Sequence, residues 1–127
     1  MRLLMLICIL ALLLSGCTQA TVRQKQTIDG VTIFLENPET IPLTREVDVI
    51  ITLVAADQRV INNAIVTLDL NMPEMSMGQN RPLADQLGGG RYRIRTTYTM
   101  IGTWKTIVIA KIGEKEYRAT FDQKVTG

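Results

Sequence analysis

The chain has 127 residues, of which 46% are hydrophobic and 20% are charged, and its formal net charge is +2. This length suits a single domain, and so small a net charge argues against a nucleic-acid partner. The sequence contains no histidine, which excludes serine–histidine and cysteine–histidine nucleophiles and histidine-based zinc sites. We therefore expect one domain that is not an enzyme and does not bind nucleic acid.

Residues 1–16 have the organisation of a secretory signal peptide. Arg2 precedes an unbroken apolar run over residues 3–14, which is shorter than the roughly 20 residues that cross a bilayer. The run leads into the sequence LSGC, which ends at Cys17 and resembles the lipobox of bacterial lipoproteins. This resemblance implies that the leader is cleaved before Cys17 and that the cysteine carries fatty acyl chains such as palmitate.

A lipid anchor of two or three acyl chains would hold the domain stably at a bacterial membrane, outside the cytoplasm. Thr18 rather than aspartate follows the cysteine, which resembles the outer-membrane sorting pattern of Gram-negative cells, where the domain would face the periplasm. Cys8 leaves with the leader, so the mature chain would have neither a disulfide nor a free thiol. We expect residues 17–29 to be the lipidated cysteine with a flexible tether, and residues 30–127 to be the folded domain.

From residue 30 onward, apolar and polar residues alternate in short runs that are separated by proline, glycine and asparagine. This alternation is typical of β-strands that are buried on one face. Several short strands in so small a domain favour an all-β, antiparallel sandwich. The predicted strands are residues 31–35, 46–54, 64–70, 92–98, 104–110 and 116–121.

The interval from residue 71 to residue 87 has no clear strand and is long for a loop in a small domain. A short strand at residues 79–84 would bring the turn that contains Met100 to the end of the sandwich where the interval begins. Without that strand, Met100 would lie at the opposite end. The sequence leaves both alternatives open.

Three methionines lie close together in residues 71–78, which read NMPEMSMG. Thioethers are soft, neutral ligands that suit Cu(I), and Pro73 favours an extended conformation of the residue before it, so the side chains could converge on one ion. Alternatively, these methionines fill gaps at the edge of the sandwich or contact a partner protein. The candidate Cu(I) ligands are Met72, Met75, Met77 and, where the topology permits, Met100.

Three motifs together resemble the YtkA-like domain family: the Met-Pro-x-Met sequence after residue 71, a Gly-x-Tyr strand start at residue 90 and a Gly-x-Trp strand start at residue 102. The resemblance implies an immunoglobulin-like sandwich, similar to the FixH group and to extracytoplasmic copper-handling domains. Copper chaperones commonly add histidine to such sites, so a chain without histidine is expected to bind Cu(I) rather than Cu(II). The family implies Cu(I) ligands at Met72, Met75 and Met77 and structural roles for Gly90, Tyr92, Gly102 and Trp104.

The basic residues of the predicted strand 92–98 offer a second candidate surface. Arg91, Arg93 and Arg95 alternate, and with Arg81 or Lys105 they could form a basic stripe for lipid phosphates or an acidic partner, but the pattern favours a solvated outer face. The sequence as a whole predicts a membrane-anchored Cu(I)-binding or copper-transfer module that serves a copper-receiving or envelope protein. The alternative is a non-catalytic interaction or structural module that binds no metal.

Overall fold

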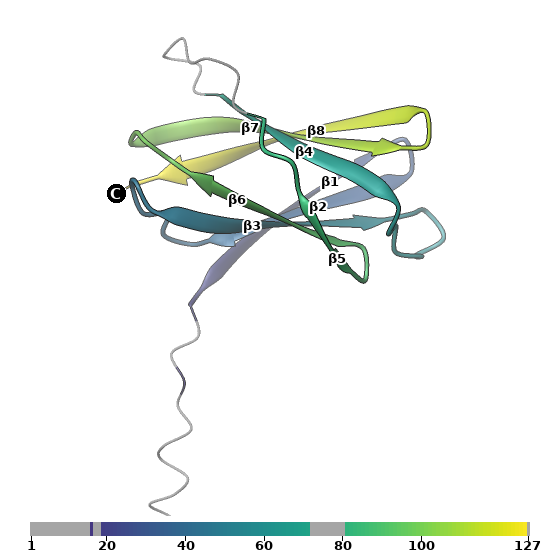
Figure 1. The fold of residues 1–127 in the computed structure, drawn as a ribbon, viewed down its shortest axis with the longest axis horizontal. Helices are drawn as coiled ribbons and strands as arrows, with labels where there is room; N and C mark the ends of the chain where they lie inside the picture. The colour runs from purple at the N-terminus through teal and green to yellow at the C-terminus, as the bar shows by residue number, and fades with distance from the viewer. Residues whose placement is uncertain (1–15, 17–18, 72–80, 127) are drawn as a thin grey trace, which may run out of the picture.

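The computed structural model describes residues 16, 19–71 and 81–126, which form two antiparallel β-sheets packed face to face (Figure 1). The predicted all-β sandwich is therefore confirmed. Within these residues, no helix is long and apolar enough to cross a membrane. The strands are β1 (Thr21–Ile28), β2 (Val31–Pro38), β3 (Glu46–Val54), β4 (Ala64–Asn71), β5 (Asp85–Gly88), β6 (Arg91–Thr97), β7 (Gly102–Ile112) and β8 (Lys115–Val125).

The strand order identifies the type of sandwich. One sheet has the order β1-β2-β3-β6-β5, and the other has the order β4-β7-β8. Without β1, these are the A-B-E-D and C-F-G sheets of a constant-type immunoglobulin domain. The immunoglobulin-like fold that the resemblance implies is therefore confirmed, and β1 is an additional strand at one edge.

The alternation of residue types in the sequence explains which sheet faces meet. In β2, Ile33 and Leu35 are fully buried while the residues between them are partly exposed, and β3 shows the same pattern with Ile51 and Leu53. Burial of each such side chain stabilises the fold by about 1.5–3 kcal/mol. The interior between the sheets is completed by four buried aromatic residues, Tyr92, Tyr98, Trp104 and Phe121.

The N-terminal boundary of the sandwich differs from the prediction. Residues 21–28, which were expected to belong to a flexible tether, form β1 and pair with β2 along their whole length. The apolar signal is weak because β1 is an edge strand in which Ile28 alone packs against the core. The expectation of a tether over all of residues 17–29 is therefore wrong for its second half.

Polar side chains hold β1 in place instead of apolar ones. The side-chain amide of Gln24 donates a hydrogen bond to the backbone carbonyl of Asp122 at 2.9 Å, and that of Gln26 donates to the carbonyl of Thr120 at 2.5 Å. Both carbonyls belong to β8, the edge strand of the other sheet. These bonds close one side of the sandwich. The two glutamines, which were predicted to belong to the tether, therefore stabilise the fold.

The chain between β4 and β6 closes the other side of the sandwich. The short strand expected at residues 79–84 lies further along the chain, as β5, which pairs with β6. Within the described part of 79–84, Leu83 forms an isolated bridge with Thr67, and the amide of Ala84 donates to the carbonyl of Val66 at 2.9 Å. The backbone of residues 83 and 84 pairs with the edge of β4 before the chain crosses to the other sheet. The strand that pairs with β6 therefore begins later in the chain than predicted.

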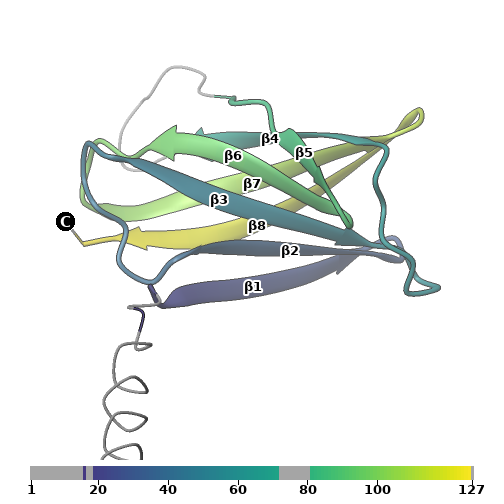
Figure 2. The same ribbon diagram turned by 60° about the horizontal axis from the view of Figure 1, so that its bottom comes forward.

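The sandwich has two ends with different connections (Figures 1 and 2). The entry end comprises the start of β1, residues 39–45, the end of β4 and the turn at residues 98–101 between β6 and β7. The hairpin end comprises the β1–β2, β5–β6 and β7–β8 hairpins and residues 55–63. Because the last residue of β4, Asn71, pairs with Lys105 near the start of β7, Met100 lies at the end where β4 finishes. Met100 therefore lies at the end that the first alternative gave it, although the strand between β4 and β6 is β5 rather than residues 79–84.

Candidate functional site

The predicted site residues divide between the described and undescribed parts of the chain. Met100 and the four glycine and aromatic positions of the motifs are described. Among residues 19–71 and 81–126, no group of three or more His, Cys, Asp and Glu side chains is arranged to hold a metal ion. The remaining predicted site residues, Cys17, Met72, Met75 and Met77, lie outside the described residues.

Both residues that flank positions 72–80 belong to the entry end. Asn71 is held by its pairing with Lys105 in β7. On the other side, the guanidinium of Arg81 forms an ion pair with the carboxylate of Asp69 in β4, with 3.2 Å between Nη2 and Oδ2. Both flanks thus lie beside the end of β4, at the same end of the sandwich as the turn that carries Met100.

Met100 lies in a turn that its neighbours hold firmly. Its side chain is half-buried and packs against the core, and its carbonyl accepts a hydrogen bond from the indole Nε1 of Trp104 at 3.0 Å. Gly102 has φ 134°, a conformation that favours glycine. Trp104 is only 1% exposed and packs edge-on against Tyr98 with 5.4 Å between ring centroids. The Gly-x-Trp motif therefore positions the backbone of Met100.

A buried hydrogen-bond network lies beside this turn. The side-chain oxygen of Gln123 accepts hydrogen bonds from the hydroxyls of Tyr98 and Thr106, both at 2.6 Å, and its amide nitrogen donates to the side-chain oxygen of Asn37 at 3.2 Å. Burial raises the pKa of the Tyr98 phenol well above its ordinary value, against a smaller opposing effect of the Gln123 hydrogen bond. The phenol therefore remains a donor, and the network joins both sheets at the entry end.

The sequence prediction missed this network, although the sequence carries a signal for it. Gln123 is buried between two apolar residues of β8, Phe121 and Val125. Thr106 is likewise a polar residue at a buried position of β7. A polar residue at such a position needs a buried partner. The alternation pattern can reveal that need, but it cannot name the partner.

The Gly-x-Tyr motif belongs to the hairpin end. Gly90 has φ 74°, and a Cβ atom there would lie 2.8 Å from the backbone oxygen of Leu53. The Tyr92 hydroxyl donates to the carbonyl of Ile61 at 2.7 Å and accepts from the amide of Ala64 at 3.0 Å. This motif therefore fastens the connection between β3 and β4 to the β5–β6 hairpin, far from Met100.

Comparison with known families decides the relationship of this chain. The model of the YtkA-like family matches residues 25–109, about two thirds of the chain. The chain belongs to the YtkA-like family. The match begins within β1 and ends within β7, so the YtkA-like region includes part of the strand that the sequence did not predict. No curated protein and no solved structure matches this YtkA-like chain.

The basic residues of β6 in this YtkA-like domain do not form a uniform basic stripe. Arg93 and Arg95 lie near Asp85 and Asp48, with nitrogen–oxygen distances of 3.8 and 3.7 Å. Such exposed ion pairs contribute little stability, but they offset the positive charge of the sheet face. Arg91 also lies in β6 and is exposed, whereas Arg81 and Lys105 lie at the other sheet, where they form ion pairs with Asp69 and Asp122.

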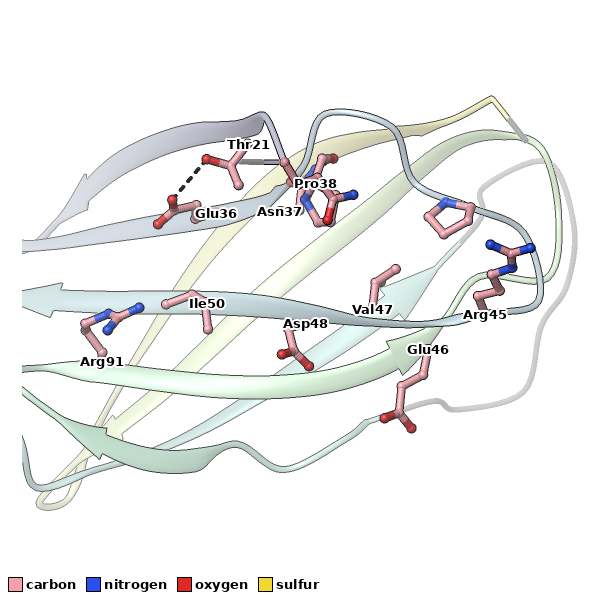
Figure 3. Close-up of a pocket in the computed structure, with 12 residues that line it drawn as sticks. Thr21, Glu36, Asn37, Pro38, Arg45, Glu46, Val47, Asp48, Ile50 and Arg91 are labelled. Atoms are coloured by element: carbon pink, nitrogen blue, oxygen red, sulfur yellow. Dashed lines mark hydrogen bonds between the residues drawn. The ribbon is translucent and has the colours of Figure 1, made fainter. Parts of the chain in front are cut away.

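A groove of about 490 Å³ opens on the outer face of the larger sheet of the YtkA-like domain (Figure 3). Glu36 and Asp48 line it beside Arg45 and Arg91. The Thr21 hydroxyl donates to the Glu36 carboxylate at 3.1 Å, which fixes the start of β1 against β2. Because acidic and basic side chains are mixed, the groove does not favour a ligand of one charge.

Proposed function

We propose that this YtkA-like protein is a lipid-anchored, extracytoplasmic module that binds Cu(I) as cargo and transfers it to a partner protein. The observation that carries the proposal is that the flanks of residues 72–80 and the turn at Met100 share the entry end. The proposed ligands are Met72, Met75 and Met77, with Met100 as the fourth thioether.

Chain length supports a shared site for these four thioethers. Met72 directly follows Asn71, and Met77 precedes Arg81 by four residues, so each lies within roughly 14 Å of a flank by the reach of an extended chain. Met100 lies five residues before Lys105, the pairing partner of Asn71. A methionine side chain adds its own flexible length, so the sulfur atoms can meet with the sandwich unchanged.

The chemistry of a thioether site suits transfer better than storage. Thioethers are neutral and soft, and they suit Cu(I) without losing a proton. With no histidine in the chain, we expect the Cu(I) affinity to be nearly constant between about pH 5 and 8, where histidine ligands would titrate. A partner that offers stronger sulfur ligands can then displace the methionines one at a time.

An anaerobic Cu(I) competition titration against a chromogenic chelator tests the proposal. We expect the acylated protein in detergent micelles to bind one equivalent of Cu(I). The triple variant Met72→Leu, Met75→Leu, Met77→Leu should lose this binding, because leucine keeps the bulk but removes the sulfur. Met100→Leu should weaken the binding, and the neighbouring substitution Ile101→Leu should leave it unchanged. Wild-type binding no greater than that of the triple variant would contradict these methionines as ligands, and no Cu(I) binding by either protein would favour the module without metal.

The lipid anchor is tested separately by mass spectrometry of protein extracted from membranes. The proposal predicts a chain that begins at Cys17 and carries two or three acyl chains. The Cys17→Ser variant should keep its leader and carry no acyl chain. A wild-type chain with an unmodified Cys17 would contradict the anchor.

A further inference from the structure

The start of β1 limits how far the domain can move from an anchor at Cys17. The amide of Glu39 donates a hydrogen bond to the carbonyl of Ala20 at 2.9 Å. The next residue, Thr21, begins β1 and pairs with Pro38. Only two residues separate Cys17 from Ala20, so the reach of an extended chain places the anchor within about 10 Å of the entry end. This connection between Cys17 and the domain is much shorter than the tether that the sequence predicted.

The entry end also carries an apolar side chain suited to a lipid interface. Ile101, in the turn between β6 and β7, is 62% exposed. Exposed basic side chains lie at the same end: Arg45 directly precedes β3, and Lys124 pairs with Thr103 at the start of β7. Basic and apolar side chains together favour contact with headgroups and the outer acyl region. Because the acidic Glu39 and Glu46 are exposed there too and balance these two basic residues, the anchor rather than charge dominates the orientation.

We infer that the entry end rests against the lipid headgroups of the membrane, with Ile101 at the interface and the hairpin end directed into the aqueous compartment. This inference depends on the proposed lipid anchor but is independent of Cu(I) binding. The eight residues of β1 separate the two ends by roughly 26 Å. A protein that exchanges Cu(I) with this end would therefore itself be held at the membrane.

Site-specific quenching by labelled lipid tests the orientation. The acylated protein is reconstituted in vesicles of phosphatidylethanolamine and phosphatidylglycerol that contain a trace of lipid with a nitroxide headgroup. A small fluorophore is attached in Ile101→Cys and, as the matched control, in Val60→Cys, which is 47% exposed at the hairpin end. We expect several-fold stronger quenching at position 101 than at position 60. Equal quenching, or stronger quenching at position 60, would overturn the inference.

Flotation of the same vesicles separates the two ways in which the experiment can fail. Protein that does not float with the vesicles would overturn both the lipid anchor and the orientation. Protein that floats but shows equal quenching at the two positions would overturn the orientation alone. Both substituted side chains are exposed, and thermal melts of the labelled proteins verify that the fold is intact before quenching is compared.

Discussion

The two ends of the sandwich are closed by different means. At the hairpin end, the backbone conformation of Gly90 and the bonds of the Tyr92 hydroxyl to two backbone groups make the closure. At the entry end, buried side chains make it, through the Gln123 network and the indole of Trp104. The bonds at the hairpin end go to the backbone of the β3–β4 connection, whereas at the entry end the Trp104 indole holds the carbonyl of Met100, a proposed ligand.

Among the substitutions that test this difference between the two ends, removal of the Trp104 side chain should have the largest effect on stability. Trp104→Ala empties the core beneath Met100 and should lower the free energy of unfolding by about 3–5 kcal/mol. Trp104→Phe keeps most of the packing but loses the bond to the Met100 carbonyl, so its cost should be clearly smaller. Urea denaturation followed by circular dichroism measures both. A cost for the alanine variant no greater than that of the phenylalanine variant would contradict a packed entry end.

A matched pair of glycines tests the backbone closure at the hairpin end. Gly89 and Gly90 both have positive φ, 63° and 74°, but a Cβ at Gly89 would meet nothing within 4 Å. Gly89→Ala should cost about 1 kcal/mol of unfolding free energy from strain alone. Gly90→Ala should cost about 2–4 kcal/mol because overpacking against Leu53 is added. Equal shifts of the denaturation midpoint would show that the close approach is not limiting.

Substitution of Gln123 tests whether the entry end depends on its polar network. Gln123→Leu leaves the hydroxyls of Tyr98 and Thr106 without their shared acceptor and should cost about 2–3 kcal/mol of unfolding free energy. The double variant Gln123→Leu, Tyr98→Phe removes one of the stranded hydroxyls, so its cost should be less than the sum of the two single costs. Strictly additive costs would mean that these groups are not coupled.

Alkaline pH should weaken the entry end through Tyr98. Because burial raises the pKa of this phenol, the folded state retains its proton after the unfolded chain begins to lose it near pH 10. The contribution to stability is full below about pH 10 and declines as the pH rises further. The free energy of unfolding should therefore fall less between about pH 9 and 11 in Tyr98→Phe than in the wild type. Identical slopes would contradict a buried, protonated Tyr98.

Local pattern was sufficient to predict some elements of the fold but not others. The strict alternation of apolar residues in β3 and β4 predicted both strands because each buries one face. The polar sequence of β1 did not predict a strand, because β1 has no apolar face although it pairs with the adjacent β2, and its glutamines bond to β8 more than 90 residues away. The position of β5 depends on where the chain crosses from one sheet to the other. The local alternation of apolar residues does not reveal that point.

The chemistry of the candidate site stays a prediction from the sequence, and its surroundings were predicted only in part. Clustered thioethers indicate a soft metal without any knowledge of the fold, and the glycine and aromatic motifs were visible as sequence. The Gln123 network was not predicted because one of its bonds joins residues 86 positions apart. The hydrogen bond between Ala20 and Glu39, which shortens the connection between Cys17 and the domain, also joins residues that are distant in the chain.

Tryptophan fluorescence during an anaerobic Cu(I) titration tests the central claim most directly. Trp104 is the only tryptophan in the chain, and its indole is hydrogen-bonded to the Met100 carbonyl, so it reports on the entry end alone. We expect Cu(I) to quench the wild-type emission with saturation at one equivalent, and to leave the emission of the triple variant Met72→Leu, Met75→Leu, Met77→Leu unchanged. Emission that ignores Cu(I), or quenching that persists in the triple variant, would contradict a methionine site at the entry end.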